Sequence, residues 1–186
     1  MPRWAVITFG RNVDRAGATL AVVHQLYGHG VAVAGFLQVK QPGAAPETVE
    51  LVRLAAEGRA LLGVRTEGRQ RGASCSFSFD AHAFATCRSW LEADAPSADV
   101  LLLHELSKLE VEGQGHAPAL TWALGLPGDR PVVFCARAEH LGQLVERFAL
   151  TSEPVAYLEH HAPGADSTRF AADLAAAVGL GACGHE

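Results

Sequence analysis

The chain has 186 residues, of which 49% are hydrophobic and 19% charged, and its formal net charge is -5. This length suffices for one substantial core and is short for two independent domains, so we expect a single domain over residues 1–186. No stretch of the chain is richer in Lys and Arg than the short one from Arg65 to Arg71. This argues against nucleic acid as a partner, because binding along nucleic acid requires a concentrated basic face. No apolar run approaches the ~20 residues of a membrane span, and residues 1–10 lack the pattern of a signal peptide. The sequence therefore predicts a cytoplasmic protein that does not enter a membrane.

The first 39 residues have the order strand, helix, strand. Trp4 to Phe9 is an apolar run rich in strand-forming residues, and a polar loop leads from it into a helix predicted over 19–30. Gly28 or Gly30 would end this helix with a left-handed cap, and a second strand follows over Val31 to Val39. Two strands joined by a helix in so short a unit are nearly always parallel, so we expect a right-handed βαβ unit.

The middle of the chain has less regular patterning. Residues 41–47 form a loop, and Thr48 to Leu62 has the apolar spacing and alanine content of a helix or an ordered crossing segment. Residues 64–79 mix charge, glycine and alternating Ser/Phe, which indicates a small hairpin or an irregular insertion beside the main sheet. Asp80 is a candidate cap for a helix over 81–94.

From the Leu101 strand onward, the sequence predicts strands and helices in alternation. The apolar run Leu101 to Leu103 predicts a buried strand, and either Asp166 or Ser167 would cap the last helix. The other elements expected are a helix over 116–126 with Pro118 in its first turn, a strand over 131–136, a helix over 138–150, a strand over 154–159 and a helix over 167–180. This order is that of a three-layer α/β domain with a mostly parallel sheet.

Charged residues and glycines directly follow the Leu101 strand. Ligands of open α/β sheets bind at the carboxyl ends of the strands, and glycines there permit close backbone approach, so this stretch is the first candidate site. Its members are His104, Glu105, Lys108, Glu110, Gly113 and Gly115. The alternatives are ordinary surface charge, an ion pair from Lys108 to Glu112 four residues on, and a hydrogen-bonded core role for His104.

The loop between the first strand and the first helix is the second candidate site. It contains Arg11 and Arg15, and backbone amides at a helix start attract anions, so a small anionic ligand is the expected occupant. The alternative is a solvated loop without a ligand. Cysteine and histidine spacing does not support a metal site: Cys135 falls in an apolar strand, and His160 and His161 are adjacent and so point in different directions. His104, as a ligand or a proton carrier, and Glu105 stay open as candidate metal-binding residues.

Two motifs taken together resemble P-loop nucleotide-binding proteins: FGRNVDRAGATL, residues 9–20, and LLLHELSKLEVEGQG, residues 101–115. More closely, the chain resembles the DUF2478 family of bacterial proteins, which is similar to the THEP1-type nucleoside triphosphatases. The resemblance covers most of the chain. It implies a P-loop-like fold and a link to molybdenum uptake or nitrogenase.

The first motif departs from an active P-loop, in which a lysine reaches the terminal phosphates and a hydroxyl residue holds Mg²⁺. AGATL stands where GKTTL is expected, so Gly17 occupies the lysine position, Ala18 occupies the hydroxyl position, and Thr19 is retained. The resemblance implies that Arg11, Arg15, Gly17 and Thr19 surround an anion. In the second motif it leaves Glu105 as the carboxylate that activates water or binds a metal, with His104 in place of the preceding acid and Lys108 and Glu110 matching the pattern.

Three functional hypotheses follow. The first is a degenerate P-loop protein that binds a nucleotide or an oxoanion such as molybdate and serves an accessory or regulatory role. The second is a slow Mg²⁺-dependent nucleoside triphosphatase that uses Glu105. The third is a non-catalytic interaction module that binds a second copy of itself or another protein.

Overall fold

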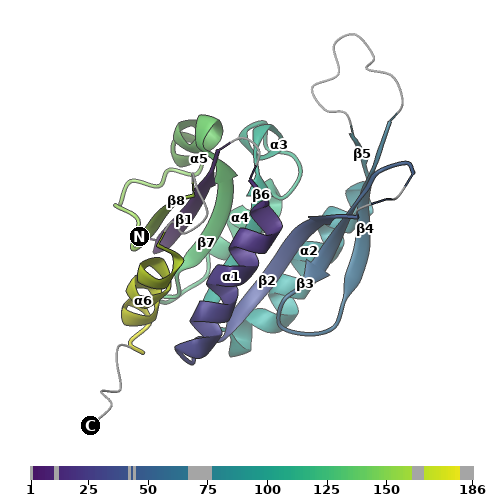
Figure 1. Ribbon diagram of the computed structural model, residues 1–186. Helices are drawn as coiled ribbons and strands as arrows, with labels where there is room; N and C mark the ends of the chain where they lie inside the picture. Colours follow the sequence, from purple (N-terminus) through teal and green to yellow (C-terminus); the bar gives the residue numbers. More distant parts are fainter. Residues whose placement is uncertain are drawn as a thin grey trace.

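The computed structural model describes residues 2–10, 13–41, 43, 45–66, 77–160 and 166–180. In this part of the chain, eight strands form a single sheet (Figure 1). The strands are β1 Trp4–Phe9, β2 Val33–Lys40, β3 Thr48–Arg53, β4 Arg59–Arg65, β5 Phe77–Phe79, β6 Val100–Leu106, β7 Val132–Arg137 and β8 Tyr157–His160. Their order across the sheet is β5-β4-β3-β2-β6-β7-β1-β8.

Helices cover both faces of this sheet. They are α1 Arg15–Gly28, α2 Ala81–Asp94, the single turn α3 Lys108–Val111, α4 Ala117–Leu124, α5 Leu141–Arg147 and α6 Ser167–Ala177. Figure 1 shows α1 and α6 in front of the sheet and α2 and α4 behind it. The core accordingly has two parts, one packed under α1 and α6 and one under α2, α4 and α5. The three-layer α/β architecture expected from the sequence is confirmed.

The strands β2, β6, β7, β1 and β8 pair in parallel. The first βαβ unit is present in this region, but β6 and β7 lie between β1 and β2. On the other side of β2, the strands β3, β4 and β5 extend the sheet in antiparallel fashion. The sheet is therefore mostly parallel, with an antiparallel extension at one end.

The helix predicted over Thr48 to Leu62 is wrong, since this segment forms β3 and most of β4. Val49 and Leu51 are buried while their neighbours are only partly covered, which is the two-residue alternation of a strand. Of the three alanines that suggested a helix, Ala55 and Ala56 lie in the connection between the two strands and Ala60 lies in β4. Pairing of β3 with β2 and β4 satisfies the backbone here, and that pairing is not visible in local composition.

The expected hairpin over 64–79 has its two arms in β4 and β5, which pair antiparallel from Gly63 to Arg65. The arms belong to the main sheet, with β5 at its edge, and residues 67–76 between them lie outside the described part of the chain.

The helix boundaries follow capping chemistry. Asp80 and Asp166 cap α2 and α6 by accepting hydrogen bonds from His82 N at 2.8 Å and Arg169 N at 2.9 Å, as the sequence predicted. Gly30 has φ +74°, which confirms the left-handed end of the first helix. That helix begins at Arg15, four residues earlier than expected, because Asp14 accepts a hydrogen bond from Gly17 N at 3.1 Å.

Candidate functional site

The two candidate segments meet at the carboxyl edge of the sheet, the upper edge in Figure 1. Phe9, the last residue of β1, is in register with Arg137, and Ala136 of β7 is in register with Leu106 of β6. The loop after β1 and the charged end of β6 are therefore separated only by β7. The tertiary structure thus brings the two sequence motifs to one place.

A bulge in β6 determines how its polar residues are directed. Leu103 pairs with Phe134 and Leu106 pairs with Ala136, so His104 and Glu105 together oppose Cys135. Leu106 consequently packs in the same part of the core as Leu103, although strict alternation would send it to the other face. Glu105 has φ +64°, a left-handed conformation that a residue with a Cβ adopts only at a cost of about 1–2 kcal/mol.

His104 points into the protein. It is 1% exposed, its Nδ1 accepts a hydrogen bond from Gln38 N at 3.1 Å, and its Nε2 lies 3.3 Å from the carbonyl oxygen of Arg15. Nε2 is therefore the protonated nitrogen. Burial lowers the pKa of His104, which keeps the ring neutral. The geometry matches the hydrogen-bonded core role, in which His104 holds the first residue of α1 against β6 and β2.

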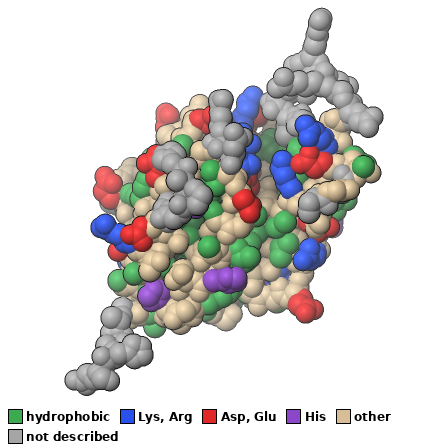
Figure 2. Space-filling model, viewed as in Figure 1, with side chains coloured by type: hydrophobic (Ala, Val, Ile, Leu, Met, Phe, Trp, Pro, Cys, Tyr) green, Lys and Arg blue, Asp and Glu red, His purple; other side chains and the backbone are tan. Residues whose placement is uncertain are grey.

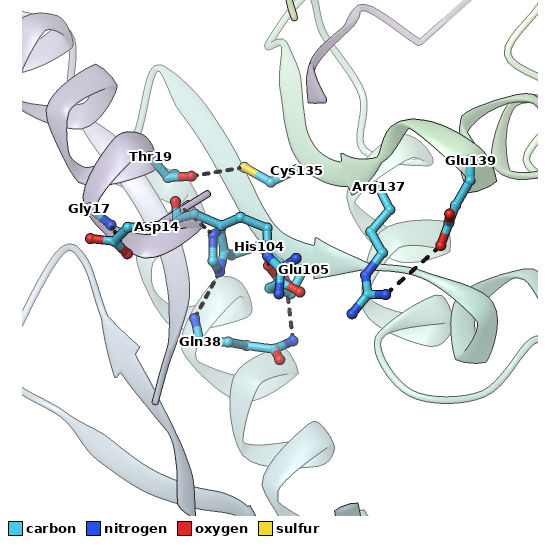
Figure 3. A network of polar contacts seen from close by, with 10 residues as sticks. Asp14, Gly17, Thr19, Gln38, His104, Glu105, Cys135, Arg137 and Glu139 are labelled. Carbon is cyan, nitrogen blue, oxygen red and sulfur yellow. Dashed lines mark hydrogen bonds and ion pairs between the residues drawn. The ribbon is translucent and has the colours of Figure 1, made fainter. Parts of the chain in front are cut away.

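Glu105, which lies next to His104 in Figure 3, forms an ion pair between its carboxylate and Nε of Arg15. The two side chains are only 17% and 22% exposed, so water screens this pair less than a surface pair. Two successive residues of β6 thus hold both the backbone and the side chain of Arg15. The sequence placed Arg15 and Glu105 in separate candidate sites, whereas in the structure they are direct partners.

The remaining residues of the first motif differ in where they point. Gly17 donates its backbone N–H to Asp14, and a Cβ on Gly17 would overlap that carboxylate. Thr19 is fully buried with its hydroxyl 3.5 Å from the Cys135 sulfur, so it faces the core and not the edge of the sheet. The core role expected for Cys135 is confirmed by its burial. Arg11 lies outside the described residues.

Glu110 is 2% exposed and organises the loop after β6. Its Oε2 accepts from Ser107 N at 2.7 Å and its Oε1 accepts from His116 N at 2.9 Å. Burial raises the pKa of Glu110 to about 7, although these backbone donors favour the ionised form. Both oxygens are already used within the loop, so in this conformation the geometry favours a structural role over direct ligand contact.

The two glycines of this motif serve the same loop. Gly113 and Gly115 have φ +81° and +59°. A Cβ on Gly115 would overlap Oε1 of Glu110, and one on Gly113 would overlap the Arg147 guanidinium. The glycines therefore allow the chain to close around Glu110.

Two further cations lie at the carboxyl ends of strands. Lys108 pairs with Glu112 at 3.6 Å, the i,i+4 alternative expected from the sequence, and its side chain is 56% exposed. Arg137, which the sequence analysis did not select, pairs with Glu139 at 3.9 Å and is 48% exposed. Both pairs are long and solvated, so they contribute little and leave donors for a ligand. The signal for Arg137 was its position directly after an apolar strand, the same rule that selected Glu105.

Sequence reasoning also missed a set of linked polar groups behind the site, in which a partly buried Gln38 joins two buried histidines, His104 and His116. Gln38 Nε2 donates to the His104 carbonyl oxygen at 3.1 Å and lies 3.1 Å from His116 Nε2. The His116 ring packs against Phe36 and Phe84 at 4.4 and 4.7 Å between ring centres, and burial lowers its pKa to about 3. A lone glutamine at the end of an apolar strand was the available signal for Gln38.

The edge as a whole is mixed in charge. Figure 2 shows basic and acidic side chains interspersed along the upper edge of the molecule in this view. Among the residues that the structure describes, no three His, Cys, Asp or Glu side chains are grouped as a metal site would require. Within the same residues, no helix has the length and apolar character needed to cross a bilayer.

The family model named "Protein of unknown function (DUF2478)" matches residues 5–160, which include every described residue of this site. The chain belongs to the DUF2478 family. A sequence comparison with curated proteins gave no significant match.

Two solved structures resemble this DUF2478 protein. The solution structure of a human cancer-related nucleoside triphosphatase has a TM-score of 0.64 at 19% identity, and the match covers 95% of this chain and 97% of that one. The crystal structure of THEP1 from the hyperthermophile Aquifex aeolicus has a TM-score of 0.57 at 15% identity, covering 77% and 82%. At such identities the likeness establishes a shared fold, and the family resemblance to THEP1-type proteins is confirmed at that level.

Proposed function

We propose that this DUF2478 protein binds a nucleotide or a related oxoanion at the carboxyl edge of its sheet and acts as an accessory or regulatory protein, not as a fast hydrolase. The observation that carries the proposal is Arg15, the first residue of α1, whose guanidinium lies at the end of β6 where phosphates bind in folds of this type. Arg137 and Lys108 lie along the same edge and supply further cationic donors.

Slow or absent hydrolysis follows from the residues that replace the catalytic ones. Gly17 has no side chain to reach a terminal phosphate, and the hydroxyl of Thr19 is buried against Cys135. Positioned cations and Mg²⁺ supply most of the stabilisation of a phosphoryl-transfer transition state. A site that lacks the P-loop lysine and an accessible hydroxyl for Mg²⁺ binds phosphate more readily than it cleaves it.

Thermal unfolding with ATP, GTP, ADP, phosphate, sulfate, molybdate and tungstate, each with and without Mg²⁺, tests the proposal. A ligand at 100 times its dissociation constant stabilises the folded state by ~2.7 kcal/mol. We expect a shift with at least one nucleotide or oxoanion, and Arg15→Ala should reduce it. Molybdate is included because the family resemblance implies a molybdenum link and a tetrahedral oxoanion suits arginine and amide donors. No shift with any compound would favour the interaction module, to be sought by analytical ultracentrifugation.

One observation favours the second candidate, a slow Mg²⁺-dependent triphosphatase: the Glu105 carboxylate lies at the strand end where it could orient water or a metal ion. This candidate requires hydrolysis that depends on Mg²⁺ and disappears in Glu105→Ala. Persistence of the activity in that variant would eliminate it.

A further inference from the structure

The donors expected to hold an anion at this site already have anionic partners from the chain itself. The Arg15 guanidinium contacts the Glu105 carboxylate. The Gly17 amide at the start of α1 donates to the Asp14 carboxylate (Figure 3). An isolated arginine or a free helix start would be open to a phosphate ion. Here internal carboxylates satisfy both.

The Arg15 to Glu105 contact is produced by the bulge and is not a chance surface pairing. Glu105 is one of the two residues in the β6 bulge, and at its φ of +64° the carboxylate contacts Arg15 of α1. In addition, His104 holds the Arg15 carbonyl, which fixes the helix start next to the bulge. A strained residue persists only where its surroundings require it, and such residues concentrate at functional sites.

The two neighbouring cations, Lys108 and Arg137, are more exposed and more loosely paired than Arg15. Lys108 and Arg137 have solvated partners at 3.6 and 3.9 Å, whereas Arg15 is held by a partner that is only 17% exposed. Among the described cations named here, a ligand approaching this edge therefore meets two that are accessible, Lys108 and Arg137, and one, Arg15, that is already neutralised.

We propose that Glu105 is a built-in counter-ion that occupies the anion position of Arg15, so that a ligand binds there by displacing the Glu105 carboxylate. This inference rests on the proposed function, because it concerns regulation and selectivity at the same site. A ligand with a single negative charge gains little binding free energy there, because it only replaces the Glu105 carboxylate as the partner of Arg15. A phosphate chain gains more, since it replaces Glu105 at Arg15 and also reaches the accessible cations. The site consequently selects polyphosphates over single-charge anions.

The test is isothermal titration of inorganic pyrophosphate, ATP and formate without Mg²⁺, using wild type, Glu105→Gln, Arg15→Ala, the double variant, and Glu92→Gln. Glu92 is the matched control, because it is also paired with an arginine, Arg88 at 2.8 Å, but on the exposed face of α2. We expect Glu105→Gln to bind pyrophosphate about tenfold or more tightly than wild type, because an adjacent like charge is removed and Arg15 is freed. Glu92→Gln should match wild type, formate should bind weakest, and the gain should vanish when Arg15→Ala is added.

The outcomes separate this inference from the proposed function. Wild-type binding with equal or weaker binding in Glu105→Gln overturns the counter-ion role and leaves the proposed function intact. Binding that becomes detectable only in Glu105→Gln supports both. A gain that survives Arg15→Ala, or that Glu92→Gln reproduces, shows a general charge effect and overturns the inference. No binding in any variant that melts as cooperatively as wild type overturns both.

Discussion

Gln38 and His104 join the carboxyl ends of β2 and β6. The backbone N–H of Gln38 donates to His104 Nδ1, and its side-chain amide donates to the His104 carbonyl oxygen, each at 3.1 Å. The opposite nitrogen of the same ring holds the first residue of α1. One neutral histidine thus connects the helix start that we propose binds an anion to the middle of the sheet.

His104→Ala should lower the free energy of unfolding by roughly 2–4 kcal/mol, because it opens a cavity, leaves the Gln38 N–H without its acceptor and removes the contact to the Arg15 carbonyl. Urea unfolding measures the loss. His24→Ala, on the exposed side of α1, is the control and should change stability by less than about 0.5 kcal/mol. Similar effects from the two variants would contradict the role assigned to His104.

Glu110 should make stability depend on pH. Burial raises its pKa to about 7 in the folded protein, so the folded state holds this proton more tightly than the unfolded state does. The stabilisation that protonated Glu110 gives the folded state is fully present below the pKa that this group has in the unfolded chain. It is lost as pH rises through about 7, and the loss in the free energy of unfolding is at most about 3 kcal/mol. Denaturant unfolding between pH 4 and 8 should therefore show wild type losing stability relative to Glu110→Gln as pH rises. Glu112→Gln, a change at an exposed neighbour, is the control, and its unfolding free energy should follow that of wild type across this pH range. If the curve for Glu110→Gln also follows that of wild type, Glu110 does not have the raised pKa.

Gly35→Ala should be among the most damaging single substitutions in the sheet. Gly35 has φ +142°, and a Cβ there would overlap the carbonyl oxygen of Leu102 in β6, which is backbone and cannot rotate away. We expect a loss of roughly 3 kcal/mol or more, or failure to fold. Gly28→Ala is the control, because nothing lies within 4 Å of its Cβ position and alanine favours a helix. A well-folded Gly35→Ala protein with wild-type stability would mean that β2 and β6 are spaced more widely than the structure shows.

Gly115→Ala and Gly113→Ala should differ in cost although both positions have positive φ. Each should lose about 1 kcal/mol from backbone strain. The alanine at 115 would also push the Glu110 carboxylate away from its bond to His116 N, whereas Arg147 beside Gly113 is a flexible side chain. Gly115→Ala should therefore cost about 1–2 kcal/mol more in thermal or urea unfolding. An equal cost would indicate that Glu110 does not depend on this turn.

Patterns within a few neighbouring residues predicted the fold well. The apolar strands, the helical periodicities and the caps Asp80 and Asp166 report the preferences of short segments, and the order of elements then restricts the architecture. The segment Thr48 to Leu62 shows where this fails. Its alternation is short and mixed with alanines, and only pairing with β2, from a different part of the chain, makes it two strands.

For the site, the sequence determined that the two motifs meet at one edge, because the carboxyl ends of parallel strands lie there and both motifs follow such strands. The family resemblance added what is missing, since it aligns Gly17 with the lysine of an active P-loop. The tertiary structure alone decided where the side chains point. Thr19 turns inward, Glu110 is used by its own loop, and Glu105 reaches Arg15, because side-chain direction depends on the register of β6 against β7, and a single extra residue in that register reverses the faces.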